Sequence, residues 1–238
     1  MKRLPLKLPA PGTVVFTIPG RQMEAEVVER PNRFMVLVRL DGELKSCHLH
    51  DPGRLGELIF KGNQVLIRKT KGRKTEYSIT AALRGSHWIL IDSRFHNKVA
   101  SSFLPWPCTP EFRIGRSRLD FRCDDFLVEV KGSTLCPDST ALFPDAPSVR
   151  ASHHAALLAE NARGGRGSLL LFLVFSPEAM RFAPNLRTDP EFHNNFWETV
   201  NTGTDVRVLK IILCGNDLIY YGEIPYTSGS REKDHFED

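Results

Sequence analysis

The segment 117–131 constrains the fold more than any other part of the chain. Apolar and polar residues alternate on both sides of Asp124 and Asp125, which is typical of strands that bury one face. Two such runs joined by two turn residues predict a β-hairpin. A two-residue turn pairs residues that lie equally far from it, so we expect Asp120 to lie opposite Glu129.

The same register predicts a charged face and an apolar face for this hairpin. Lys131 follows Glu129 by two positions, so both side chains leave the strand on one side, and Arg118 is opposite Lys131. The residues predicted on the apolar face are Leu119, Phe121, Val128 and Val130. All of these assignments depend on the turn length, because a shift of one residue exchanges the two faces.

Opposed carboxylates in this hairpin indicate a metal site. Side chains directly opposite on paired strands have Cβ atoms about 4.5–5.5 Å apart, and like charges there are destabilising. Mg²⁺ offsets such repulsion and is typically held by one or two carboxylates, water and substrate phosphate. Asp120 and Glu129 are therefore candidate ligands, and Lys131 can stabilise a phosphate undergoing hydrolysis. A surface hairpin in which Lys131 forms an ion pair with either carboxylate is the alternative.

The first 90 residues predict a small barrel or sandwich of short strands. Glycine-containing turns, such as those at 19–20 and 41–42, separate closely spaced β-type runs. We expect an OB-type barrel, because such barrels bind nucleic acid strands on a basic face. The predicted strands are 13–18, 23–29, 34–40, 44–48, 64–69, 76–83 and 88–92.

Charge is distributed unevenly along the chain, and this favours a polyanionic partner. Residues 1–90 hold 16 Lys+Arg and 8 Asp+Glu, whereas the remainder holds 16 and 20. A basic front half is typical of a domain that contacts nucleic acid. Arg30, Arg33 and Arg54, with Phe34 nearby, fit contacts to DNA backbone and bases. Solvated turn and edge-strand charges are the alternative.

Residues 93–227 predict an α/β domain with a mixed sheet, because strand and helix patterns alternate there. We place the domain boundary at 92, after the barrel, and expect the polar tail 228–238 to be disordered. The predicted strands are 111–114, 117–123, 126–131, 168–175 and 205–214, and the predicted helices are 97–104, 148–161 and 190–202.

The helix 148–161 begins with a cationic face. Arg150 and His154 are four residues apart and therefore share one side of the helix. Near a helix N-terminus they can face a phosphate of DNA. The alternative is that Ser148 caps the helix while both side chains are solvated.

The cysteines and the chain start favour a reducing cytoplasm. The five cysteines are widely spaced and include no CxxC pair, so we expect neither a disulfide framework nor a cysteine zinc site. His48 and His50 alternate as zinc ligands can, but no third ligand lies at a useful spacing. The first 12 residues contain three prolines and no apolar core, unlike a signal peptide. The longest apolar run, 169–175, is too short to cross a membrane.

Seven segments in a fixed order connect the chain to a known family. They are 30–34 (RPNRF), 48–55 (HLHDPGRL), 92–97 (DSRFHN), 117–121 (SRLDF), 129–131 (EVK) followed by Thr134 and Leu135, 143–146 (FPDA) and 189–190 (DP). With these segments the chain resembles the sugar fermentation stimulation protein A family of prokaryotes. The resemblance implies an N-terminal OB-like β-barrel and a C-terminal mixed-sheet domain of the PD-(D/E)XK nuclease-like fold. It also implies sequence-tolerant DNA binding and a role in regulating sugar (maltose) metabolism.

Carried over by position, the resemblance assigns roles to single residues. Asp120 and Glu129 would be ligands of Mg²⁺ or Mn²⁺, Lys131 the catalytic lysine, and Glu111 an additional candidate ligand. The chain departs from the family around the helix 148–161, where Ala151, Ser152 and His153 replace glycine, glutamine and lysine, and Pro147 replaces valine. These changes leave the proposed metal ligands in place and remove side chains that would position water or phosphate.

Two functions follow from the sequence. One is a divalent-metal-dependent DNA phosphodiesterase, which rests on Asp120, Glu129 and Lys131. The other is a non-catalytic DNA-binding regulator of sugar metabolism, which rests on the basic front half. Neither involves a membrane or a small-molecule cofactor, and the sequence leaves the oligomeric state open.

Overall fold

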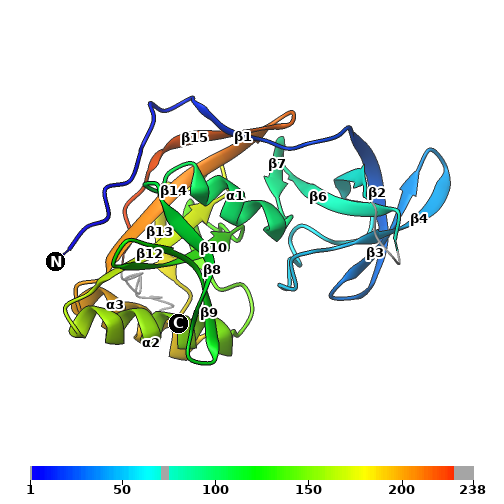
Figure 1. The fold of residues 1–238 in the computed structure, drawn as a ribbon. Coiled ribbons are helices and arrows are strands. Elements are labelled where there is room, and N and C mark those ends of the chain that lie inside the picture. Colours follow the sequence, from blue (N-terminus) through cyan, green and yellow to red (C-terminus); the bar gives the residue numbers. More distant parts are fainter. Residues whose placement is uncertain (1, 71–74, 228–238) are drawn as a thin grey trace.

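The structure, a computed structural model, describes residues 2–70 and 75–227. A barrel of strands lies beside a larger mixed sheet that carries helices (Figure 1). The tail that the sequence predicts to be disordered, 228–238, lies outside the described residues.

The N-terminal domain is a closed barrel, as the sequence predicts. Strands β4, β3, β2, β5 and β6 are neighbours in this order, β4 pairs back to β6 to close the barrel, and β7 extends the sheet beside β6. Alternate side chains such as Ala25, Val27, Val36 and Val38 are buried inside it, as the two-residue period of a strand requires. The strands are β2 (Gln22–Asn32), β3 (Met35–Leu40), β4 (Glu43–His48), β5 (Gln64–Lys69), β6 (Tyr77–Arg84) and β7 (His87–Leu90).

The C-terminal domain is built on a mixed sheet with strand order β1-β15-β14-β12-β10-β9-β8. Its central strands β10, β12 and β14 are parallel, and all residues of β12 are buried because both faces of the sheet are covered. The strands are β1 (Val14–Thr17), β8 (Cys108–Ile114), β9 (Ser117–Cys123), β10 (Phe126–Ser133), β12 (Gly167–Val174), β14 (Asp205–Cys214) and β15 (Asp217–Glu223).

Helices cover the two faces of this sheet unequally. The long helices α2 (Val149–Arg163) and α3 (Pro190–Asn201) lie side by side on one face, and the short α1 (His96–Ser101) lies between the sheet and the barrel (Figure 1). Ser148 and Asp189 cap α2 and α3 by accepting backbone N–H bonds, as these residue types favour. No helix in the described ranges is long and apolar enough to cross a membrane.

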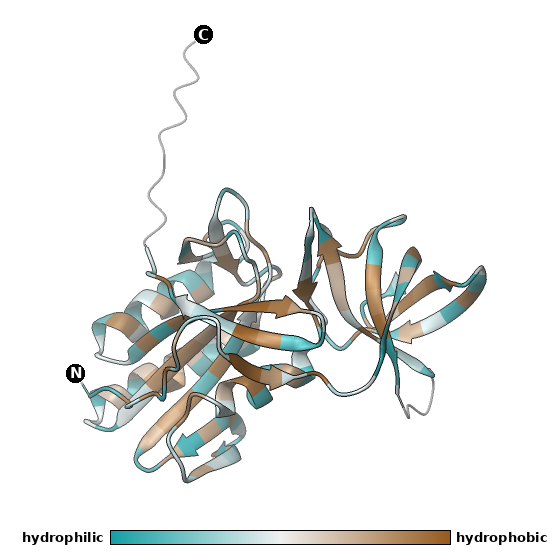
Figure 2. Cartoon of the chain, turned by 90° about the horizontal axis from the view of Figure 1, so that it is seen from above, coloured by the Kyte–Doolittle hydropathy of each residue, from teal (hydrophilic) through white to brown (hydrophobic). Residues whose placement is uncertain are grey.

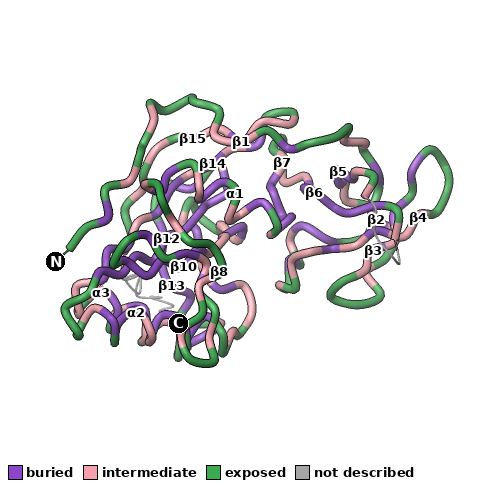
Figure 3. The backbone as a smooth tube through the Cα atoms, viewed as in Figure 1, coloured by how far each residue is buried: buried purple, intermediate pink, exposed green. Residues whose placement is uncertain are grey.

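The hydrophobic core has two parts, one on each face of the sheet. One part joins the barrel interior to the face that α1 covers, so the two domains share a continuous apolar contact. The other lies under α2 and α3 and includes Phe172, Phe192 and Phe196. Figure 2 shows the apolar residues concentrated in the central strands, and Figure 3 shows the same strands as buried.

The first strand of the chain lies in the C-terminal sheet. The predicted first domain, 1–92, includes residues 14–17, but β1 pairs antiparallel with β15 and not with a strand of the barrel. The strand itself is predicted correctly, whereas its partner is not encoded in local pattern.

Three strands lie outside the predicted elements. β11 (Thr140–Phe143) and β13 (Arg181–Pro184) form a separate two-stranded parallel sheet, and β15 continues the hairpin from β14. β11 and β13 have only four residues each, too few for a clear alternation of apolar and polar positions. β15 follows β14 through a turn that includes Gly215, whose φ of 58° suits glycine.

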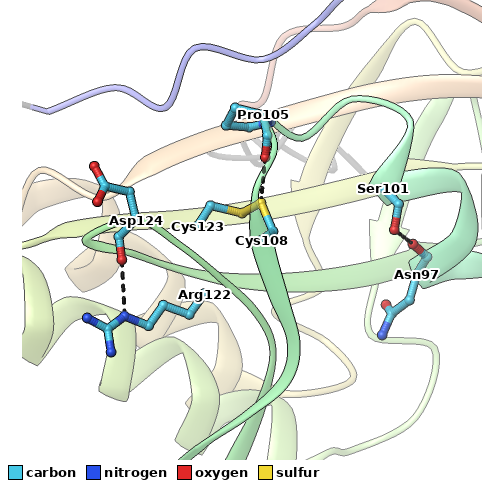
Figure 4. The surroundings of a disulfide bond; sticks show 7 residues. All are labelled: Asn97, Ser101, Pro105, Cys108, Arg122, Cys123 and Asp124. Carbon is cyan, nitrogen blue, oxygen red and sulfur yellow. Dashed lines mark hydrogen bonds between the residues drawn. A yellow bond between two sulfur atoms is a disulfide. The ribbon is translucent and has the colours of Figure 1, made fainter.

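A disulfide corrects the expectation that the cysteines stay unpaired. Cys108 and Cys123 are directly opposite in the antiparallel pair β8–β9, with 4.2 Å between their Cα atoms, and are bonded (Figure 4). The sequence spacing of 15 gave no sign of this, because the pairing depends on the register of two strands. The free cysteines are Cys47, Cys136 and Cys214.

Candidate functional site

The candidate site lies where β9 and β10 separate. The observed pairs Cys123–Phe126, Arg122–Leu127 and Phe121–Val128 have the register that the two-residue turn predicts. The ladder ends there, one position before Asp120 and Glu129. The two carboxylates therefore lie at the mouth of a gap between two strands and not on a continuous pleated surface.

A local distortion of β8 and β9 lies next to this gap. Glu111 has a φ of 52°, in the left-handed region, and the β8–β9 register omits the pair that Glu111 and Asp120 would form. Leu119 packs under the helices, whereas Phe121 packs in the core on the other side of the sheet. The prediction that Leu119 and Phe121 share one face is therefore wrong, because the strand turns over at Asp120.

Asp120 occupies the gap with its carboxylate. Its Oδ2 accepts the backbone N–H of Val130 at 2.8 Å, and its Oδ1 accepts a hydrogen bond from Asn97 Nδ2 at 2.8 Å. Burial, followed by the nearby charge of Glu129, raises the pKa of Asp120 above its ordinary value. The charge of Glu129 thus acts on Asp120, although the predicted pairing of these two residues lies beyond the end of the observed ladder.

Glu129 is buried at 2% exposure and is engaged on one oxygen only. Its Oε1 lies 2.5 Å from both Lys131 Nζ and His154 Nδ1, while its Oε2 is buried without a hydrogen-bond partner. Burial raises the pKa of Glu129, but the hydrogen bond to His154 and the charge of Lys131 outweigh it and hold the pKa below its ordinary value. The carboxylate is thus charged at neutral pH.

A cleft between the two domains borders this site. Its volume is about 280 Å³, and both the barrel and the C-terminal domain contribute to its walls. Its polar lining includes Asp51, His96, Lys131, Asp145, Ser148 and Arg150. Lys131 thus contacts Glu129 on one side and borders an open space on the other.

Two loops that the sequence singles out form one wall of this cleft. Asp145 of the FPDA segment accepts the backbone N–H of Leu55 at 3.2 Å, and its carboxylate lies where a side chain on Gly53 would stand. Asp51 accepts the N–H of Gly53 at 2.8 Å, and burial raises the pKa of Asp51 to about 6. These bonds hold the 51–55 loop of the barrel against the C-terminal domain.

Two residues predicted for the site, Arg118 and Glu111, lie away from it. Arg118 is exposed and opposite Arg113 of β8, so the predicted position opposite Lys131 is wrong, because β9 has already left β10. Glu111, the additional candidate ligand, has a side chain that is 68% exposed and lies 3.5 Å from Arg118. No contact in the described residues brings Glu111 to Asp120 or Glu129.

The helix α2 places its two predicted phosphate ligands differently. Arg150 is exposed in the first turn and lines the cleft. His154, one turn later on the same side, is 3% exposed and bonded to Glu129. The prediction that His154 contacts DNA is wrong, since its side chain is buried against the carboxylate.

The barrel residues predicted to contact DNA also divide into two kinds. Arg33 and Arg54 are exposed. Arg30 instead donates to the carbonyls of Gly53, Arg33 and Arg54, so it ties two loops together. His48 and His50 lie with ring centroids 4.2 Å apart, and no third metal ligand joins them among the residues described.

Sequence reasoning missed Asn97 and His96. Asn97 orients Asp120, and the ring of His96 lies against Gly132, where an added Cβ would be 2.2 Å from its Cε1. Burial lowers the pKa of His96 to about 4, and its Nε2 has no hydrogen-bond partner. Both residues belong to the matching segment 92–97, which was the one available signal.

Comparison with known proteins identifies the family. Residues 28–91 match the family model described as "SfsA N-terminal OB domain", and residues 93–215 match "Sugar fermentation stimulation protein RE domain". The chain belongs to the sugar fermentation stimulation protein family. Its curated relatives include a "Sugar fermentation stimulation protein homolog" from Saccharolobus solfataricus, 48% identical over 90% of this chain and 89% of the relative. Another, from Thermoplasma volcanium, is 46% identical over 83% of this chain and 91% of the relative.

A solved structure of this family has the same fold. "The structure of Pyrococcus Furiosus SfsA in complex with Ca2+" is similar with a TM-score of 0.82 and 25% identity, covering 90% of this chain and 99% of that one. The resemblance drawn from seven short segments and the OB-like N-terminal domain are thereby confirmed. In the present chain, strands β1 and β15 lie outside the two ranges that match the family models.

Proposed function

We propose that this family member is a sequence-tolerant DNA-binding protein whose C-terminal domain holds one divalent cation, Mg²⁺ or Mn²⁺, and hydrolyses phosphodiester bonds. The observation that carries the proposal is the convergence of Asp120, Glu129 and Lys131 at the opening between β9 and β10, beside the cleft. Two carboxylates and a lysine on one hairpin of a mixed sheet support a PD-(D/E)XK nuclease-like site.

The carboxylates fit a hard divalent cation. Glu129 Oε2 is buried without a partner, and an unsatisfied buried charge is costly, so a cation there would be stabilising. A cation between Glu129 and Asp120 would also reverse the repulsion that helps to raise the pKa of Asp120. No group of three or more His, Cys, Asp or Glu ligands occurs in the described part of the chain, but Mg²⁺ needs only one or two carboxylates besides water. The Pyrococcus furiosus relative is in complex with Ca²⁺, a hard divalent cation that takes oxygen ligands, and this supports the proposal of a divalent-cation site.

The neighbouring side chains fit phosphodiester chemistry. A bound divalent cation supplies Lewis acidity toward phosphate oxygen and lowers the pKa of coordinated water. Lys131, held 2.5 Å from Glu129 Oε1, brings a positive charge to the edge of the cleft where a phosphate would lie. Arg150 in the first turn of α2 can bind an adjacent phosphate. His154 acts as a positioning residue, because it fixes the Glu129 carboxylate from the buried side.

In this proposal the barrel is the part of the protein that binds DNA. Arg33 and Arg54 are exposed on it, and the first 90 residues carry a net excess of positive charge. Phosphate contacts hold a duplex or a strand without reading its bases, which fits sequence-tolerant binding. Such a protein acts where DNA is, in the cytoplasm of a prokaryote, and requires neither a membrane nor a small-molecule cofactor.

A second candidate is a non-catalytic DNA-binding regulator of sugar metabolism. The observation that favours it is that the Glu129 carboxylate already has partners within the protein, because its Oε1 contacts both Lys131 and His154. In this candidate the ion pair between Lys131 and Glu129 is structural, and the barrel alone provides the function.

Nuclease assays separate the two candidates. The full chain is incubated with linear single- and double-stranded DNA and Mn²⁺ or Mg²⁺, beside Lys131→Ala and the control Lys61→Ala, an exposed lysine of the barrel. The enzyme proposal expects cleavage by wild type and Lys61→Ala, and a loss of about 100-fold or more in Lys131→Ala, as for other removed transition-state contacts. Equal cleavage by all three proteins, or none by any of them, would refute it.

Binding measurements test the two halves of the proposal separately. By calorimetry, Glu129→Ala should abolish Mn²⁺ binding, while the control Glu198→Ala, a half-exposed residue of α3, should retain it. DNA binding in EDTA should fall steeply with salt and weaken in Arg33→Ala but not in Glu129→Ala. A flat salt dependence would rule out the DNA-binding part.

A further inference from the structure

A small aromatic surface lies on the barrel around Phe34. Phe34, in the turn between β2 and β3, is 42% exposed although its side chain is large and apolar. The His48 ring is parallel to it within 4°, with ring centroids 6.3 Å apart. The guanidinium carbon of Arg33 lies 4.7 Å from the centroid of the Phe34 ring. We call Arg33, Phe34 and His48 the Phe34 platform.

The Phe34 platform is held in place by backbone contacts. The Phe34 carbonyl accepts the N–H of Leu49 at 2.9 Å, and the Phe34 N–H donates to Asn32 Oδ1 at 2.9 Å. Arg30 links the platform to the 51–55 loop through the carbonyls of Arg33 and Gly53. A ligand that binds here therefore meets a surface that is already ordered, which lowers the entropy cost of binding.

The platform continues toward the cleft of the candidate site. The chain runs directly from His48 to Asp51 and Pro52, which line the same cleft as Lys131. Arg54, exposed in the same loop, adds a second cation beside the platform. The π surface, the cations and the residues that line the cleft thus lie on two segments of the barrel, 33–34 and 48–54, which Arg30 ties together.

We propose that the Phe34 platform stacks an unpaired base of a DNA strand and directs that strand into the cleft. The inference rests on the proposed DNA-binding function and adds to it the class of substrate, a single strand or a frayed end. Bases within a duplex already stack on each other, so their faces cannot lie on a protein ring without being flipped out. A free base of any sequence has a π face, and aromatic rings with arginines are the usual platform for it.

The test compares two DNA probes on the full chain in EDTA. One is a fluorescein-labelled oligothymidylate of about 15 nucleotides, within the site size of one OB fold. The other is a blunt, fully paired duplex with G·C-rich ends, which presents no unpaired base. Phe34→Ala should weaken oligothymidylate binding by roughly 5- to 100-fold, the equivalent of about 1–3 kcal/mol for one stacked base. Its effect on duplex binding should stay under about twofold, since phosphate contacts are unchanged.

Two further variants control this experiment. Phe60→Ala removes another exposed ring of the same domain. Phe60 is 50% exposed and makes no ring contact among the described residues. The Phe60→Ala variant should therefore bind both DNA probes as wild type does. Phe34→Trp keeps a stacking surface and should restore the affinity for oligothymidylate. Thermal unfolding of each variant establishes that it is folded.

The outcomes distinguish this inference from the proposal on which it rests. Salt-sensitive DNA binding that Phe34→Ala leaves unchanged, or weakens equally for both probes, would overturn the stacking platform and leave DNA binding intact. Binding of neither probe by wild type at low salt would overturn both.

Discussion

Replacing Glu129 by glutamine should destabilise the protein strongly in the absence of metal. Glutamine keeps the shape of the side chain but removes the charge that Lys131, with 14% side-chain exposure, and His154 contact. Removing one partner of a buried ion pair costs about 3–5 kcal/mol, because the other charge is left uncompensated. Lys131 borders the cleft and can extend toward water, so we expect the lower end, about 3 kcal/mol.

Thermal unfolding in EDTA measures this effect. For a chain of this length, 1 kcal/mol shifts the melting temperature by about 2–4 °C, so Glu129→Gln should melt roughly 6–12 °C below wild type. The matched control is Glu198→Gln, which breaks a pair with Arg163 whose side chains are half exposed. It should shift the melting temperature by no more than about 4 °C. A Glu129→Gln variant that melts with the control would refute the reasoning.

The destabilisation should also depend on pH in a defined direction. The pKa of Glu129 is below its ordinary value in the folded protein, so its charge contributes stability above the unfolded pKa of about 4.3. That stability is lost as the pH falls through the lower, folded pKa. The difference in melting temperature between wild type and Glu129→Gln should therefore be largest near neutral pH and shrink below about pH 4.3.

Three further predictions concern metal, packing and the disulfide. Mn²⁺ at about 100 times its dissociation constant should add about 2.7 kcal/mol to wild-type stability in thermal unfolding, and Asp120→Asn should lose that gain. Gly132→Ala should cost about 1–3 kcal/mol, because its Cβ would lie 2.2 Å from the His96 ring; Gly56→Ala, with no atom within 4 Å, should cost far less in the same denaturation assay. Cys108→Ser opens the disulfide across 15 residues and should lower the free energy of unfolding by about 3 kcal/mol, so equal stability of oxidised and reduced wild type would contradict it.

The sequence predicted the elements of the fold better than their assembly. Alternation and turn residues located the barrel strands and the long helices, because these signals act over a few residues. The pairing of β1 with β15 and the bond between Cys108 and Cys123 depend on registers that distant segments set together. Local pattern carries no information about such contacts.

The candidate site shows the same division at the scale of single residues. The turn at 124–125 correctly fixed the hairpin register as far as Phe121 and Val128. Beyond that pair β9 and β10 separate, Arg118 is exposed, and the Asp120 side chain accepts the backbone N–H of Val130, next to the left-handed backbone at Glu111. Nothing in a two-residue periodicity anticipates a break of this kind, and the partner Asn97 comes from another element.

The pairing of β1 with β15 makes the barrel a domain inserted within another domain. The chain begins in the C-terminal sheet, leaves it after Thr17 to form the whole barrel, and returns before β8. Two chain crossings and a shared apolar core therefore connect the domains, which resists swivelling of the barrel over the cleft. During synthesis, β1 must also wait for the last strand of the sheet before it has a partner. A fragment that starts after the barrel would leave β15 with an open edge, where another chain can pair and aggregate.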